Sequence, residues 1–194
     1  MKRNIILGAA AFASLATLTA CGGGAEEAPA PDATEEAPAP AAEETEAAAA
    51  PEEAAEPVPA AEANGTVIEI NMYTRDPDNS SGMQVFKPRL VTASVGDTIK
   101  FVPSDPTHQS SSIEDMVPAG VTGWEGKINE EVTYVIPATG IYGYKCVPHY
   151  AAGMVGMIVV GEGDELTNLA AAKELSHPGL GGKAFTEIFE EAGI

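Results

Sequence analysis

Residues 25–63 form a tract with almost nothing from which to build a hydrophobic core. Its composition includes 17 Ala, 12 Asp or Glu and 7 Pro, no aromatic residue, and one large aliphatic residue, Val58. Such a segment buries too little apolar surface to offset the entropy lost on folding, and its repeated prolines interrupt any long helix. We therefore expect a disordered linker, and residues 65–194 are left to form the folded domain.

The first twenty residues have the pattern of a secretion signal. Lys2 and Arg3 precede an apolar run over residues 5–18, which is too short for a stable membrane span. We therefore expect residues 1–20 to be a signal peptide that is removed from the mature protein.

The signal ends in the tetrapeptide LTAC at residues 18–21, which resembles the lipobox of bacterial lipoproteins. In that family the chain is cleaved before the cysteine, whose thiol then carries the lipid, so Cys21 is the expected lipidation site. The alternative is an ordinary signal peptide with a coincidental cysteine. Lipidation would anchor residues 21–64 to a bacterial membrane as a tether. Gly22 stands where lipoproteins retained in the inner membrane carry Asp, which favours the outer membrane.

Residues 65–194 contain several short β-prone runs separated by turn residues such as Gly96-Asp97 and the PATG segment at 137–140. Such spacing is typical of a small Greek-key β-sandwich, so the fold class is mainly β. The expected strands are 66–72, 90–95, 98–102, 131–136, 141–146 and 155–160.

Near the C-terminus the apolar residues recur with the period of a helix instead of the two-residue period of a strand. Leu169, Ala172 and Leu175 fall on one face of a helix that starts near Asn168. Four further apolar residues have the i, i+3, i+4, i+7 spacing of a second amphipathic helix: Phe185, Ile188, Phe189 and Ala192. Two C-terminal α-helices are therefore expected.

The richest chemistry lies between the last two predicted strands. Cys146, His149 and Met154 are spaced C-x2-H-x4-M, and His108 lies in a loop after an earlier strand. If Cys21 is lipidated, Cys146 has no disulfide partner, and a free thiol outside the cytoplasm would oxidise unless it binds a metal. Two imidazoles, a thiolate and a weak axial thioether form the ligand pattern of blue-copper sites.

Other chemistries fit these residues less well. A zinc site lacks a second pair of cysteines, and the C-x-x-C-H motif of haem attachment is absent. A nucleophilic pair of Cys146 and His149 has no accompanying oxyanion-hole or orienting motif. A copper-binding module for storage or delivery remains the alternative, because it would use similar ligands while exchanging its metal more readily.

Across its folded part the chain resembles pseudoazurins, which belong to the cupredoxins. Plastocyanins share the C-x2-H-x4-M loop, but the two C-terminal helices and the 38 positions from His108 to Cys146 favour pseudoazurin. The matching stretches are VGDT at 95–98, DPTH at 105–108, IEDMVP at 113–118, KINE at 127–130 and YGYKC at 142–146.

This resemblance implies a cupredoxin domain over residues 65–194, with one type 1 copper held by His108, Cys146, His149 and Met154. Both imidazoles would bind through Nδ1, and the far edge of His149 would be the electron port. An apolar patch would surround that edge: Val147, Pro148, Ala151 and Ala152. The implied activity is single-electron transfer in the periplasm, without catalysis of a reaction.

The sequence departs from the family at two positions near the copper. Gln109 stands where these proteins usually carry Asn, whose side chain ties the two ligand loops together. Gln84 stands where many carry Met beside the exposed histidine, with Met83 one place earlier. We expect Gln109 and Pro148 to contact the copper ligands without binding the metal themselves.

The charge of the folded part bears on its partners. Residues 65–194 contain 8 Lys or Arg and 17 Asp or Glu, which favours basic donors such as a cytochrome c. The family resemblance implies nitrite or nitrous oxide reductase as the electron acceptor, although pseudoazurins usually present a basic surface to these reductases. Lys87, Lys100, Lys127 and Lys145 could form a local basic rim. A monomer is expected, and no binding to nucleic acid.

Overall fold

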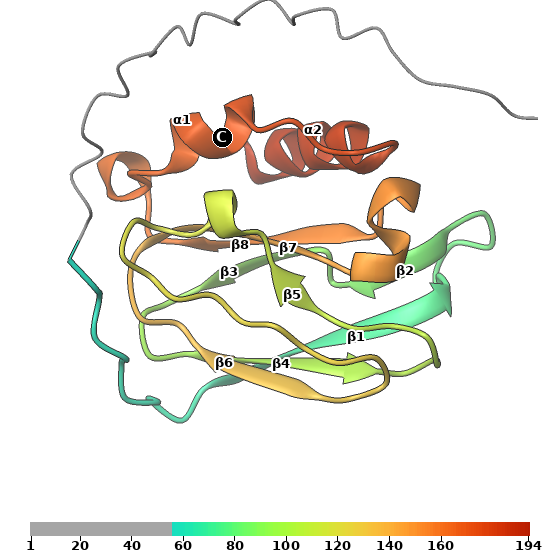
Figure 1. The fold of residues 1–194 in the computed structure, drawn as a ribbon, viewed down its shortest axis with the longest axis horizontal. Coiled ribbons are helices and arrows are strands. Elements are labelled where there is room, and N and C mark those ends of the chain that lie inside the picture. The colour runs from blue at the N-terminus through green and yellow to red at the C-terminus, as the bar shows by residue number, and fades with distance from the viewer. Residues whose placement is uncertain (1–55) are drawn as a thin grey trace, which may run out of the picture. The chain divides into compact units, whose positions relative to one another are not determined.

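The computed structural model describes residues 56–194, and two four-stranded sheets packed face to face form its body (Figure 1). The first sheet has the strand order β2-β1-β4-β6, with β1 parallel to β4 and antiparallel to β2. Its strands are β1 (Val67–Arg75), β2 (Met83–Lys87), β4 (Thr98–Pro103) and β6 (Val132–Val135). The second has the order β3-β8-β7-β5. Its strands are β3 (Leu90–Ala93), β8 (Val155–Val160), β7 (Gly140–Lys145) and β5 (Ser111–Ser112).

The burial of the strands explains their sequences. In β1, Ile70 and Met72 are buried while Glu69 and Asn71 are more exposed, because one face of this sheet meets the core and the other meets water. Every residue of β8 is buried. Its continuous apolar run fits a strand that is covered on both faces, by the opposite sheet and by the C-terminal helices.

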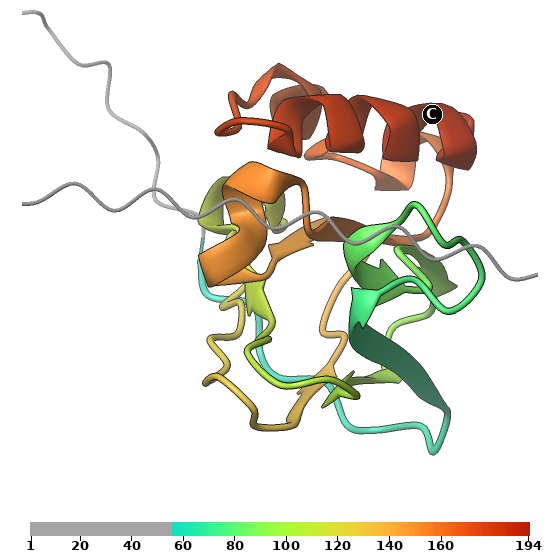
Figure 2. The ribbon, with the colours of Figure 1, turned by 90° about the vertical axis from the view of Figure 1, so that its right-hand side faces the viewer.

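Both C-terminal helices lie on the outer face of the β3-β8-β7-β5 sheet, as Figure 2 shows from the side. They are α1 (Leu169–Glu174) and α2 (Gly181–Ala192). Phe185, Ile188 and Phe189 are buried, so the predicted apolar stripe of the second helix is confirmed. Three short 3-10 helices complete the fold: η1 (Glu114–Met116), η2 (Val147–Ala152) and η3 (Gly163–Glu165).

The predicted Greek-key sandwich with two C-terminal helices is confirmed, and all six predicted strands are present within a few residues of their expected bounds. The strands β2 and β5 were not predicted. In β2, Gln84 has a left-handed φ of 54°, which breaks the regular alternation of a strand. With only two residues, β5 is too short to show any period.

Residues 56–64 follow a defined path along the folded domain, which differs from the free tether expected for residues 21–64. The backbone N–H of Val58 donates to the carbonyl of Gly120 over 2.8 Å, and its side chain packs on the core between the sheets. The Asn64 side-chain amide donates to the Asp97 carboxylate over 2.7 Å. Val58, the one large aliphatic residue of the tract, thus has a place in the core.

The expected signal peptide of residues 1–20, Cys21 and the first part of the tether lie outside the described residues. Among residues 56–194, no helix is both long enough and apolar enough to cross a membrane.

Candidate metal centre

The loop between β7 and β8 carries three of the four predicted ligands. Cys146 follows directly after β7, His149 lies in η2, and Met154 directly precedes β8. The Cys146 N–H donates to the Met154 carbonyl over 3.0 Å, and the Met154 N–H donates to the His149 carbonyl over 3.2 Å. Gly153 makes the return turn with a φ of 91°, in the left-handed region that glycine adopts without steric cost.

His108 reaches the same place from the other sheet. It lies in the loop after β4, 38 positions before Cys146. Asn129 holds this loop in place, since its side chain accepts the Thr107 N–H over 2.6 Å and its own N–H donates to the His108 carbonyl over 2.8 Å. The sandwich thus joins two segments that are far apart in the sequence.

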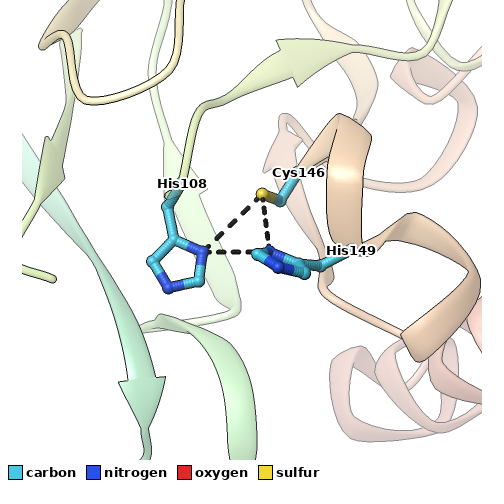
Figure 3. Close-up of side chains that lie close together, drawn as sticks. All are labelled: His108, Cys146 and His149. Carbon is cyan, nitrogen blue, oxygen red and sulfur yellow. Dashed lines mark hydrogen bonds between the residues drawn. The ribbon is translucent and has the colours of Figure 1, made fainter. Parts of the chain in front are cut away.

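The side chains of His108, Cys146 and His149 converge on one point (Figure 3). The two Nδ1 atoms are 3.2 Å apart, and the Cys146 sulfur lies 3.8 Å from Nδ1 of His108 and 3.4 Å from Nδ1 of His149. Ligand atoms that share one ion at about 2.0–2.3 Å lie roughly 3–4 Å from one another. The three side chains therefore fit a single metal ion without rearrangement.

The site is closed to solvent except at one ligand. His108, Cys146 and Met154 are fully buried, whereas His149 is half-buried. Burial lowers the pKa of His108, and the nearby His149 lowers it further, while Asp105 opposes both effects. The neutral imidazole that a metal requires is thus favoured at His108.

The Cys146 thiol lies in an environment that needs a cation to ionise it. Burial raises the pKa of this thiol, whereas the backbone N–H groups of Gln109 and His149, which point at the sulfur, lower it. A buried thiolate is costly unless it is paired. A metal ion at the convergence point would supply the missing positive charge.

Thr74 on β1 orients His108 from the far side of its ring. The Thr74 hydroxyl lies 3.1 Å from Nε2 of His108, and the Thr74 N–H donates to the Asp105 carboxylate over 2.8 Å. When Nδ1 binds a metal, Nε2 carries the proton and donates to this hydroxyl. Sequence reasoning missed Thr74, because nothing in a local pattern connects residues 34 positions apart.

Gln109 and Pro148, the two residues predicted to contact the ligands without binding the metal, differ in their surroundings. The Gln109 side-chain amide donates to the Ser111 hydroxyl over 3.3 Å, so this bond stays within its own segment and does not bridge the two ligand loops. Pro148 is exposed in the first turn of η2. Met83 is 53% exposed at the start of β2, beside the half-buried Gln84.

Comparison with known proteins places this constellation within a family. The family model of copper-binding proteins of the plastocyanin/azurin family matches residues 74–161. A pseudoazurin of Paracoccus pantotrophus is 40% identical over 119 residues, which cover 61% of this chain and 79% of the relative. A pseudoazurin of Methylorubrum extorquens is 40% identical over 110 residues, which cover 57% and 73% of the two chains.

The fold comparison agrees with the sequence comparison. The refined crystal structure of pseudoazurin from Methylobacterium extorquens superposes with a TM-score of 0.60 at 36% sequence identity. The superposition covers 65% of this chain and 98% of the relative. Nearly the whole of that protein therefore corresponds to the folded part of this one.

Replacing Thr74 by Val should weaken metal binding, because the buried Nε2 of His108 would lose its hydrogen-bond partner. Loss of such an outer partner costs roughly 10–100-fold in metal affinity. Competition against a copper chelator measures this change. Thr92→Val, at an exposed position of β3, is the matched control and should bind like the wild type. Equal affinities for the two variants would contradict the role of Thr74.

Proposed function

The chain belongs to the pseudoazurin family of cupredoxins, and from that premise we propose that it carries single electrons between redox proteins in the periplasm. The proposed ligands are His108, Cys146, His149 and Met154. Bound copper would supply the redox chemistry by cycling between Cu(II) and Cu(I). The observation that carries the proposal is the convergence of three ligand atoms, all within 4.8 Å of one another, on one buried point.

The ligand types suit an ion that must change its charge without moving its surroundings. The soft thiolate of Cys146 stabilises Cu(I) and delocalises charge from Cu(II), and the two imidazoles bind both states. Met154 is fully buried at the end of the same loop and is the proposed weak axial ligand. A site that suits both states rearranges little on electron transfer, which keeps transfer fast. No bond-making step, and hence no catalytic residue, is proposed.

His149 is the proposed port for electrons because it is the most exposed of the four ligands. The other three are fully buried. Exposed apolar residues lie beside it in sequence on η2: Val147, Pro148, Ala151 and Ala152. Such a surface sheds water readily when a partner docks, and so allows the two redox centres to approach closely.

The charge of the described domain favours a basic partner. Two of the four lysines considered for a basic rim are neutralised in ion pairs, Lys87 with Asp76 and Lys100 with Glu131. A cytochrome c-type donor with a basic docking surface would be steered to this acidic protein at low salt. Nitrite or nitrous oxide reductase is proposed as an acceptor on family grounds alone.

The same ligands could serve copper storage or delivery, in which case the metal would exchange readily. Full burial of three of the proposed ligands favours a retained metal over an exchanging one.

A lipid anchor at Cys21 is part of the proposal. The described chain passes along the domain from Val58 to Asn64, whose backbone N–H donates to the Gly96 carbonyl immediately before β4. His108 follows the other end of β4, so the tether joins the domain at the end remote from the copper ligands. In Figure 1 the entering segment lies at the left and the helical turn that carries His149 at the right. An anchored carrier would thus keep its port free for partners at a high local concentration.

Copper loading tests the central proposal. Addition of Cu(II) to the purified protein should give an intense blue thiolate-to-copper band and a reversible one-electron reduction. Cys146→Ser should abolish the colour, because it removes the thiolate. Met154→Leu should keep the colour and raise the reduction potential, since a weak axial donor stabilises Cu(II). A colourless wild type would refute the proposal, and a blue protein that loses copper rapidly would favour storage.

Replacing Ala151 by Glu should slow electron exchange with redox partners without bleaching the copper. The new charge would resist desolvation at the docking surface around His149. Ala171→Glu adds the same charge at an exposed position of α1, which packs near the opposite end of β7, and serves as the control. Stopped-flow rates at fixed ionic strength measure the effect. Equal rates for the two variants would exclude the port at His149.

The anchor is tested by fractionation of cells that express the full-length chain. The wild type should sediment with the membranes, and Cys21→Ser should move to the soluble fraction. Cys146→Ser, which removes the other cysteine, should remain with the membranes. Membrane association of Cys21→Ser equal to that of the wild type would refute lipidation at this residue.

A further inference from the structure

The segment that connects α1 to α2 packs directly on the loop that carries His149. We name residues 177–181 the clasp. The Leu180 N–H donates to the carbonyl of Ala151 over 2.9 Å, and the Tyr150 hydroxyl lies 2.6 Å from Nδ1 of His177. Both contacts are made to η2, the 3-10 helix between Cys146 and Met154. The clasp thus touches the ligand loop from outside the metal centre.

The two segments approach so closely that glycine is required where they meet. A Cβ atom on Gly179 would lie 2.3 Å from the carbonyl oxygen of Ala151, and Gly179 also has a left-handed φ of 55°. A Cβ atom on Gly181 would lie 3.1 Å from the ring of Tyr150. The backbone of the clasp thus lies directly against η2, and this close packing leaves the loop little room to move.

His177 is itself fixed to the body of the protein. Its ring packs on Phe185 of α2, with the ring centroids 4.4 Å apart. Phe185 is buried, and Arg89 holds α2 against the sheet through ion pairs with Glu187 and Glu191 at 3.4 and 2.9 Å. The clasp therefore connects the loop to a helix that is packed against the sheet.

The bond between Tyr150 and His177 joins a phenol hydroxyl to a ring nitrogen, and its direction depends on which nitrogen of His177 carries the proton. Burial lowers the pKa of His177, and the positive charge of Lys145 lowers it further. The Lys145 ammonium also lies over the Tyr150 ring, 5.1 Å from its centroid. A neutral His177 with its proton on Nε2 accepts the Tyr150 proton at Nδ1.

We propose that His177 is a positioning residue for the copper site, which holds the loop carrying His149 through its hydrogen bond with Tyr150. The proposal rests on the ligand set proposed above. Tyr150 directly follows His149, so movement of the tyrosine would displace the imidazole and alter its bond to copper. The clasp keeps this imidazole in one position in both oxidation states and in the metal-free protein.

The test uses three substitutions in the full-length protein with its anchor removed by Cys21→Ser. His177→Phe keeps a ring on Phe185 but removes the acceptor, and Tyr150→Phe removes the donor. His177→Asn restores an acceptor near the position of Nδ1. Ile188→Val shortens a fully buried side chain of α2 outside the clasp and is the control for a general loss of stability.

Amide hydrogen exchange of residues 147–153 in the metal-free protein is the first measurement. His177→Phe and Tyr150→Phe should each speed exchange by roughly 2- to 12-fold, the factor that corresponds to the loss of one ordinary hydrogen bond. The double variant should match either single variant, because both remove the same bond. His177→Asn should restore the protection. Unchanged exchange in His177→Phe would overturn the proposal.

The reduction potential and visible spectrum of the copper-loaded protein are the second measurement. They should shift in His177→Phe and Tyr150→Phe and return in His177→Asn, whereas Ile188→Val should lower the melting temperature without either shift. Faster loop exchange with an unchanged potential would overturn the positioning role. A wild type without the blue band would refute the ligand set, and with it the part of the inference that concerns copper. Amide hydrogen exchange of residues 147–153 would still decide whether the clasp holds η2.

Discussion

The pairing of β7 with β8 is the interaction on which the rest of the site depends. The two strands form an antiparallel ladder from Gly140–Val160 to Lys145–Val155, and the Cys146 N–H extends it by bonding to the Met154 carbonyl. This closure forces the intervening residues into a tight loop, which brings the Cys146 thiol within 3.4 Å of Nδ1 of His149. A shift of register by one residue would turn Cys146 away from the core.

The proposed ligands come from loops of both sheets, and the loop of His108 has its own supports. His108 arrives from the other sheet and is held by Thr74 at its ring and by Asn129 at its backbone. The clasp supports His149 in the same way, from the helical layer. Each histidine is thus fixed by a different layer of the protein, so the position of the ion is set before the metal binds.

The arrangement also separates the protein into ends with different tasks. Asn64, Gly96 and Asp97 tie the incoming chain to the end where β4 begins, and the ligands gather at the end where β4 finishes. The proposed anchoring at one end would leave the other free for exchange with partners. In the proposed function, the excess of acidic residues would select partners by charge, and the exposed apolar residues next to His149 would permit close approach.

The sequence by itself determined the features that depend on local chemistry or local period. These are the C-x2-H-x4-M loop and the apolar stripe of Phe185, Ile188 and Phe189. Tertiary structure alone decided the partner of His108, the clasp on η2 and the docking of Val58. Each of these contacts joins residues at least 27 positions apart, and no local period records such a distance. Only the packing of the two sheets and the helices brings them together.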